Sequence, residues 1–310
     1  MNVYASEWDD AIFGSGNTSA RFLYNNKFDA HGTDAGGTAY GDNNCPSVIQ
    51  NFDWMSPAAK AMGRYIDEGS SVTARAARFT SLVNDKQFIC PSSDLTGVIF
   101  DAGGLTLPAV VKLPSYSAAI LFHYNGYNGG VQYETYTDPK EIALPSSYRP
   151  RVRFIGPPVA KIFLADGARY SDTLTKPDLN VKVFTTDEST QFADAGSCFQ
   201  NYSKAGIQTH CWDRSLATGN SNANGGTVDA RIYSFRHGTS SQLRPTGSYK
   251  MNAGFFDGHA ELITDKDAMN PALWMPTGTS FKKSPFSGVD AGQQKDSLAN
   301  YVSGTTYIAP

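Results

Sequence analysis

The segment NAGFFDGHAELI, residues 252–263, holds the side chains whose types and spacing are best suited to chemistry. Alternate residues of an extended strand lie on one face, so Asp257, His259 and Glu261 would share a face. Three such ligands could bind a divalent metal ion, and His237 from the preceding segment could join them. A metal-dependent hydrolase that uses Asp257, His259 and His237 is therefore one interpretation of this segment.

The same segment also carries a strong turn signal. The dipeptide Asp257–Gly258 favours a tight turn, and apolar residues stand on both sides of it, with Phe256 before and Leu262 after. A turn at this point would break the face that the three metal ligands need. We therefore predict a turn that joins two strands here, and no metal site.

Signatures of catalysis are absent elsewhere in the sequence. A histidine acting as a general base needs a nucleophile and an orienting acid, and no G-x-S-x-G motif accompanies His237. The sequence also has no P-loop, no G-x-G-x-x-G and no H-E-x-x-H. We predict that the protein is not an enzyme and that it holds no cofactor.

A binding module is an alternative function. Asp29, Asp34 and Asp42 lie in a polar loop and could bind calcium, although their spacing matches no EF-hand loop. Tyrosines, of which there are 16, could bind sugars together with Asn and Gly, but they also suit strand packing and subunit contacts. The alternative is thus a secreted carbohydrate- or calcium-binding module.

The four cysteines are Cys45, Cys90, Cys198 and Cys211, and no C-x-x-C pair exists, which argues against a zinc ribbon. We predict the disulfides Cys45–Cys90, because each residue begins a CPS triplet, and Cys198–Cys211, because the two flank a short polar loop. The alternative is four buried free thiols. Disulfides would place the protein in an oxidising compartment.

Charge and hydropathy exclude two kinds of partner. The net charge is −3 and no basic run is present, whereas a sequence-independent nucleic-acid binder needs a basic face. The longest apolar stretches, at residues 118–122 and 159–165, fall far short of the ~20 residues of a membrane-spanning helix. The first ten residues lack the basic start and apolar core of a signal peptide, so we expect a soluble chain or one whose export segment was removed.

Hydrophobic periodicity predicts helices in the first third of the chain and strands after it. Expected helices cover residues 1–8, 56–68 and 70–83, and expected strands cover 97–101, 118–124, 151–156, 159–166, 180–186, 229–236 and 252–263. This order indicates an α+β fold. We expect one domain over residues 1–310, with a helical, loop-rich part (1–95), a β-rich part (96–264) and an irregular C-terminal extension (265–310).

The phrase RHG (236–238), followed by NAGFFDGHAEL (252–262), resembles the prepilin-type proteins of planctomycetes and related bacteria. Their C-terminal signature is a histidine, nine further residues and Asp-Gly, usually followed by histidine. The positions that match this signature are His237, Asn252, Phe256, Asp257, Gly258 and His259. Other phrases of the same kind are MNVYASEWDDAIFG (1–14), DWMSP (53–57), FICPSSD (88–94), KIFLADGARYSD (161–172), DARIYSFRHG (229–238) and NPALWMPTGT (270–279).

Two features depart from the family pattern. Nineteen residues separate His237 from Asp257 instead of nine, which an insertion around residues 240–249 explains. The printed sequence also does not contain the apolar N-terminal helix that anchors a prepilin in the membrane and then forms the filament core.

The resemblance implies a pseudopilin-like fold, in which an N-terminal helix packs on an antiparallel sheet with long loops. It further implies an exported, non-enzymatic structural subunit outside the cell or on its surface. Copies of the same chain, and the machinery of pili or type II secretion, are the expected partners. The family supplies no catalytic residue, so the signature positions are expected to be structural. A capsid- or sheath-like shell subunit of the same fold is the alternative to a filament.

Overall fold

The structure is a computed structural model of the 310-residue chain. It describes residues 2–7, 9–13, 54–64, 81, 84–92, 96–100, 110–112, 115–123, 126, 142–166, 178–180, 194–195, 237–238, 249–268, 270–282 and 306–310. The possible calcium ligands Asp29, Asp34 and Asp42 and the cysteines Cys45, Cys198 and Cys211 lie outside these ranges.

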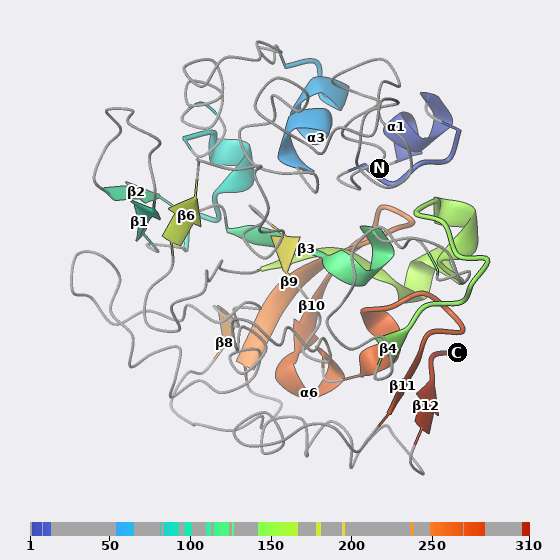
Figure 1. The fold of residues 1–310 in the computed structure, drawn as a ribbon. Helices are drawn as coiled ribbons and strands as arrows, with labels where there is room; N and C mark the ends of the chain where they lie inside the picture. Colours follow the sequence, from blue (N-terminus) through green and yellow to red (C-terminus); the bar gives the residue numbers. More distant parts are fainter. Residues whose placement is uncertain are drawn as a thin grey trace.

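An antiparallel β-sheet lies at the centre of the described structure (Figure 1). Its main strands, in spatial order, are β10 (Ala260–Thr264), β9 (Tyr249–Phe255), β5 (Ile162–Asp166) and β3 (Tyr116–Ala119). The short strand β7 (Asp194–Ala195) runs parallel to β3, and β8 (His237–Gly238) runs antiparallel to β9. Along β9, Met251, Ala253 and Phe255 are buried while Asn252 is exposed, as expected of a strand with one face on the core.

A β-bulge in β5 shapes the core. Ile162 pairs with Phe255 and Leu164 pairs with Gly254, so Phe163 is an extra residue in the ladder. Ile162 and Phe163 are consecutive and yet both are buried, because a bulge re-aims side chains that would otherwise alternate between faces.

The bulged residue joins a row of aromatic rings. Phe163 lies 4.8 Å from Phe13 and 5.1 Å from Phe256, measured between ring centroids. Phe122 extends the row beyond Phe256 at 4.9 Å, and Tyr4 extends it beyond Phe13 at 5.4 Å. Three of these four contacts are edge-to-face, a geometry that is favourable beyond the area it buries, so this row links the N-terminal segment to the sheet.

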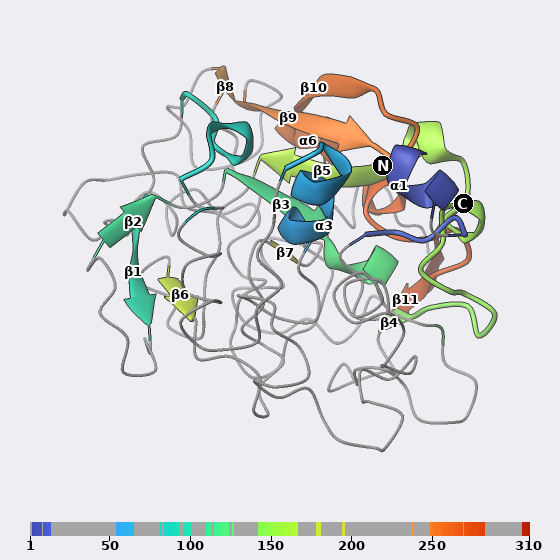
Figure 2. The ribbon, with the colours of Figure 1, turned by 90° about the horizontal axis from the view of Figure 1, so that it is seen from above.

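The α-helices with described bounds are short: α1 (Asn2–Glu7), α3 (Met55–Ala61) and α6 (Asp265–Ala268). Helix α3 buries Met55, Ala58 and Ala59, which share one helical face. In Figures 1 and 2, α1 and α3 lie together on one side of the sheet, and α6 lies against β9 and β10. Short 3₁₀ helices connect the strands: η1 (Lys86–Phe88), η2 (Ile120–His123), η3 (Val152–Phe154), η4 (Pro158–Ala160) and η6 (Pro271–Leu273).

Two smaller sheets accompany the central one among the residues that the structure describes. The first contains β1 (Thr96–Phe100), β2 (Val110–Lys112) and β6 (Asp178–Asn180), with β1 in the middle. The second contains β4 (Ile142–Ala143), β11 (Ser280–Lys282) and β12 (Thr306–Ile308), with β11 in the middle.

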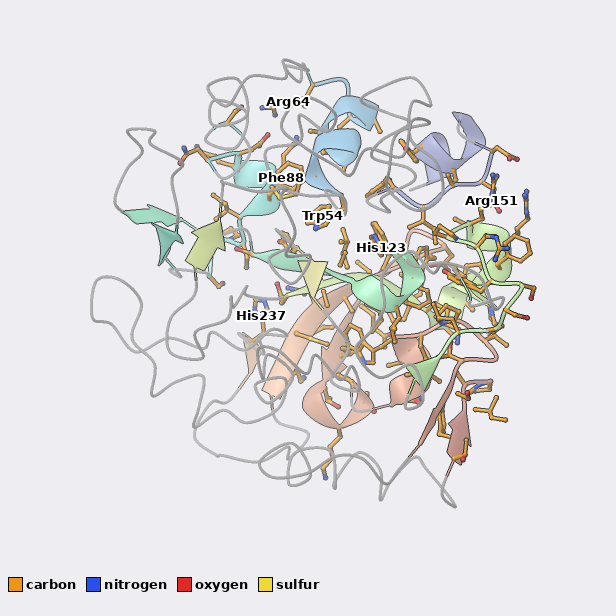
Figure 3. All side chains as sticks on the ribbon, viewed as in Figure 1. Trp54, Arg64, Phe88, His123, Arg151 and His237 are labelled. Atoms are coloured by element: carbon orange, nitrogen blue, oxygen red, sulfur yellow. The ribbon has the colours of Figure 1, made fainter. Side chains whose placement is uncertain are left out.

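Contacts distant in sequence tie both ends of the chain to residues 150–161. The amide of Ile12 donates to the carbonyl of Pro150 at 3.0 Å, and the guanidinium of Arg151 (labelled in Figure 3) binds Asp9. Lys161 is only 1% exposed, and its Nζ donates to the carbonyl oxygens of Ala272 at 2.9 Å and Pro310 at 3.1 Å. Burial lowers the pKa of Lys161 to about 8.

Some of the helices and strands predicted from the sequence are confirmed by the structure and others are wrong. Helix 1–8 and strands 97–101 and 159–166 are confirmed, as α1, β1 and, for its second half, β5. The strand predicted at 151–156 is wrong, since η3 forms there between Pro150 and Pro157. The strand predicted at 118–124 ends at Ala119, where a 3₁₀ turn follows. That turn allows the consecutive residues Leu121, Phe122 and His123 to be buried together, which a strand with one buried face does not.

Other expected elements are only partly described or not described. Helix 56–68 corresponds to α3, which ends at Ala61, and its residues beyond 64 lie outside the described ranges. Strand 229–236 and nearly all of helix 70–83 also lie outside them, as does strand 180–186 after Asn180.

Candidate functional site

Asp257 and Gly258 form the turn between β9 and β10, as the Asp-Gly dipeptide predicts. The amide of Gly258 donates to the carbonyl of Phe255 at 3.0 Å, and the amide of Phe255 donates to the carbonyl of His259 at 2.9 Å. Gly258 has a φ of 98°, a conformation that favours glycine. The segment 252–263 is therefore two strands and a turn, not one continuous strand.

The side chains of the turn are held by one another. His259 Nδ1 lies 2.6 Å from Asp257 Oδ1, and the imidazole stacks on Phe255 with 4.2 Å between ring centroids. Partial burial raises the pKa of Asp257, but hydrogen bonds from His259 outweigh this, so the pKa lies below its usual value. Glu261 is 4.0 Å from the other ring nitrogen. These contacts give the side chains of the turn a structural role, because they hold the end of the β9–β10 hairpin together.

His237 does not reach this turn. In the register of β8 and β9 it pairs with Lys250, whereas His259 stacks on Phe255 at the other end of β9. Five residues of extended strand span roughly 17 Å. The structure therefore keeps His237 apart from Asp257 and His259, and the three-residue metal site considered for them is not assembled.

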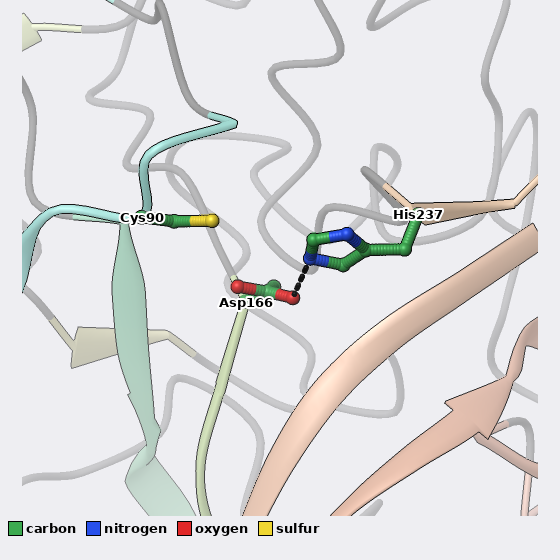
Figure 4. Close-up of side chains that lie close together, drawn as sticks. All are labelled: Cys90, Asp166 and His237. Atoms are coloured by element: carbon green, nitrogen blue, oxygen red, sulfur yellow. Dashed lines mark ion pairs between the residues drawn. The ribbon is translucent and has the colours of Figure 1, made fainter.

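His237 instead meets residues from distant parts of the chain. Alternate residues of β9 share a face, so Asn252 lies on the same side as Lys250 and within diagonal reach of His237. Asp166 ends β5 immediately after Ala165, the partner of Ala253, which brings its carboxylate beside Asn252. We call Cys90, Asp166, His237 and Asn252 the Asp166 cluster (Figure 4 shows the first three).

The Asp166 carboxylate is fully buried and joins two strands. Its Oδ2 accepts the backbone amide of Asn252 at 2.7 Å and lies 3.3 Å from Nε2 of His237. The same Nε2 is 2.8 Å from Nδ2 of Asn252. A buried carboxylate is costly unless it is hydrogen-bonded or paired with a cation, so these contacts stabilise the end of β5 against β8 and β9.

Cys90 brings sulfur to this cluster. It follows η1, is 4% exposed and is a free thiol. Cys90 is predicted to pair with Cys45, which lies outside the described residues, so this disulfide stays a prediction. The predicted pairing of Cys198 with Cys211 lies outside the described residues.

A mainly apolar cavity of about 570 Å³ adjoins the cluster. Its walls include Trp54, Phe88, Leu164, Tyr116 and Asn252, so it lies between α3, η1 and the sheet. Figure 3 shows Trp54 and Phe88 below α3, where their rings contact each other at 5.5 Å. Asn252 therefore belongs both to the cavity wall and to the cluster.

Sequence reasoning singled out His237 and Asn252 but missed the role of Asp166 and the partnership with Cys90. An acid directly after the buried run of residues 162–165 was the available signal, since a carboxylate at such a position needs a partner. The identity of that partner depends on the pairing of β5 with β9, which the sequence does not display.

Comparison of the chain with protein-family models, with curated proteins and with solved structures gives no match. Among the described helices, none has the length and apolar character needed to cross a membrane.

Proposed function

We propose that this protein is a non-enzymatic structural subunit of an extracellular or cell-surface assembly, with a pseudopilin-like α+β fold. Copies of the same chain are its main partners, and the machinery of pili or type II secretion is the expected route of export. A filament is the first form of the assembly, and a capsid- or sheath-like shell is the alternative.

The observation that carries this proposal is that the segments resembling the prepilin-type family form neighbouring strands of one sheet. KIFLADGARYSD supplies β5, RHG supplies β8, and NAGFFDGHAEL supplies most of β9 and β10, and these four strands are neighbours in one sheet. The signature residues His237 and Asn252 contact each other there, and both contact Asp166. Segments far apart in sequence thus lie together in one sheet, which supports treating the family-like phrases as parts of one structural unit of this chain.

The geometry of the thiol favours a structural over a catalytic role. A cysteine nucleophile needs a base within hydrogen-bond reach. Cys90 Sγ lies near the His237 ring, but the two make no hydrogen bond. Asp257 and His259 lie at a hairpin turn whose backbone and ring contacts account for both residues.

The direct test is self-association of the purified full chain at neutral pH without reductant. Electron microscopy should show ordered fibres or closed shells, and light scattering should show a mass that rises with concentration. Fibres would favour the filament and shells the sheath or capsid form. A protein that stays monomeric at every concentration, and that has no assembly partner in its source cell, would overturn the proposal.

Exposed edge strands supply a sharper version of the test. Within the described residues, β10 and β12 end their sheets, and Leu262 and Ile308 are 48% and 66% exposed on them. Edge strands pair readily with other chains, and a lysine on the edge opposes this. Leu262→Lys and Ile308→Lys should therefore weaken assembly, whereas Met62→Lys, at an exposed position after α3, should leave it unchanged.

A further inference from the structure

We propose that Cys90, Asp166 and His237 bind a Zn²⁺ ion that fastens β8 and the segment after η1 to the end of β5. One donor atom from each residue lies within 4.8 Å of the other two, in a group that spans three separate parts of the chain. Figure 4 shows the sulfur of Cys90 directed toward the space between the Asp166 carboxylate and the His237 ring.

The distance between the His237 nitrogen and the Asp166 oxygen suits two ligands of a tetrahedrally coordinated ion. Nε2 of His237 and Oδ2 of Asp166 are 3.3 Å apart. Bond lengths of about 2.0–2.2 Å from zinc to nitrogen and oxygen place two such ligands about 3.4 Å apart at the corners of a tetrahedron. The slightly longer zinc–sulfur bond of about 2.3 Å lets a thiolate occupy a third corner.

The donor types select the ion. Thiolate and imidazole bind Zn²⁺ and other borderline or soft ions, whereas Ca²⁺ and Mg²⁺ require oxygen ligands. Asp166 is fully buried and Cys90 nearly so, and a cysteine ligand loses its proton when a metal binds, so the metal-bound site holds a thiolate and a carboxylate. A divalent cation balances both charges, which otherwise oppose burial.

The polar contacts of His237 are compatible with a bound cation. Nε2 of His237 faces two different partners. Oδ2 of Asp166 is an acceptor, so it requires a proton on Nε2, whereas Nδ2 of Asn252 is a donor, so it requires a lone pair on Nε2. A single ring nitrogen satisfies only one of them unless the Asn252 amide is turned by 180°. An ion between Nε2 and Oδ2 takes both lone pairs, and a rotated Asn252 amide or a water fills the fourth corner. The backbone amide of Asn252 already holds Asp166 Oδ2 in place, as outer partners of metal ligands do.

Metal binding by the reduced full-length protein tests this site. After chelator treatment and desalting, one equivalent of ZnCl₂ should bind by calorimetry and raise the melting temperature. One equivalent of CoCl₂ should bind too and give the near-ultraviolet charge-transfer band of a thiolate–Co²⁺ bond, while CaCl₂ and MgCl₂ should not bind at the site. Absence of stoichiometric zinc binding, or a Co²⁺ spectrum without the thiolate band, would overturn the site.

Matched variants identify the ligands. Cys90→Ala and His237→Gln should each weaken zinc binding by more than the roughly 10- to 100-fold that changes around a metal site cost. His237 is partly exposed, so its variant should remain folded by circular dichroism. His259→Gln, in the turn at the other end of β9, should bind zinc as the wild type does. Unchanged affinity in both ligand variants, or lost affinity in His259→Gln, would refute the assignment. Either result leaves the assembly proposal to be judged separately.

Discussion

Lys161 links the chemistry of a single residue to the stability of the fold. Its pKa is lowered to about 8 by burial, whereas an exposed lysine titrates near 10.4. Between these values the unfolded chain binds a proton that the folded chain does not, so the stabilising free energy rises with pH. As the pH drops from about 10.4 to about 8 this free energy is lost, and below about 8, where Lys161 is protonated in both states, it changes no further.

Urea denaturation of the wild type and of Lys161→Met, at pH 7 to 10, measures this contribution. The difference in midpoint between them should shift in favour of the wild type as the pH rises from 8 to 10. Above pH 10 burial acts in the opposite sense, because it raises the pKa of Tyr307 to about 12 and that of Tyr148 well above its usual value. Parallel profiles of the two proteins from pH 7 to 10 would contradict the assignment to Lys161.

At the residue scale, local chemistry was predictable and remote chemistry was not. The turn at Asp257 and Gly258 is predictable from the sequence because two adjacent residues determine it. Lys161 lies in an apolar run, but its acceptors are 111 and 149 residues away. The sequence therefore shows a lysine among buried residues without showing the carbonyl groups that make its burial tolerable.

At the scale of elements, Asp166 should determine how firmly β5 is joined to β9. Asp166→Ala removes the acceptor of the Asn252 amide, and an unsatisfied buried donor costs about 1–3 kcal/mol. Hydrogen exchange at the Asn252 amide should accelerate correspondingly. The Phe255 amide, bonded to the carbonyl of His259, is the internal control and should remain protected. Equal acceleration at both amides would instead indicate general destabilisation.

The elements also show which sequence patterns were reliable. Val159–Asp166 was predicted as a strand, and β5 forms in its second half because four of its five residues are buried. Residues 151–156 carry the same apolar types, yet prolines on both sides and a bonded turn produce η3. Strand propensity thus describes the environment in which a side chain packs, and that environment is set by pairings that the sequence does not reveal.

For the molecule as a whole, the N-terminal segment should unfold together with the central sheet. Ile12 is fully buried, beside Phe13, whose ring contacts Phe163 of β5. Ile12→Ala should lower the free energy of unfolding by about 2–5 kcal/mol, in a single transition with an unchanged urea slope. Ile308→Ala, at a site that is 66% exposed, should change it by less than about 0.5 kcal/mol. A separate early transition in the Ile12 variant would show that the segment is an independent unit.

The order of strands in the central sheet governs when the protein can fold during its synthesis. Asp166 leaves the ribosome 86 residues before Asn252, the residue that its carboxylate binds. Until β9 follows, the backbone N–H and C=O groups on one edge of β5 lack the strand that pairs with them. Strand pairings between residues far apart in sequence form slowly, and the intermediates that precede them are prone to aggregate. We therefore expect a nascent chain of this protein to expose an unpaired strand edge until β9 has been translated.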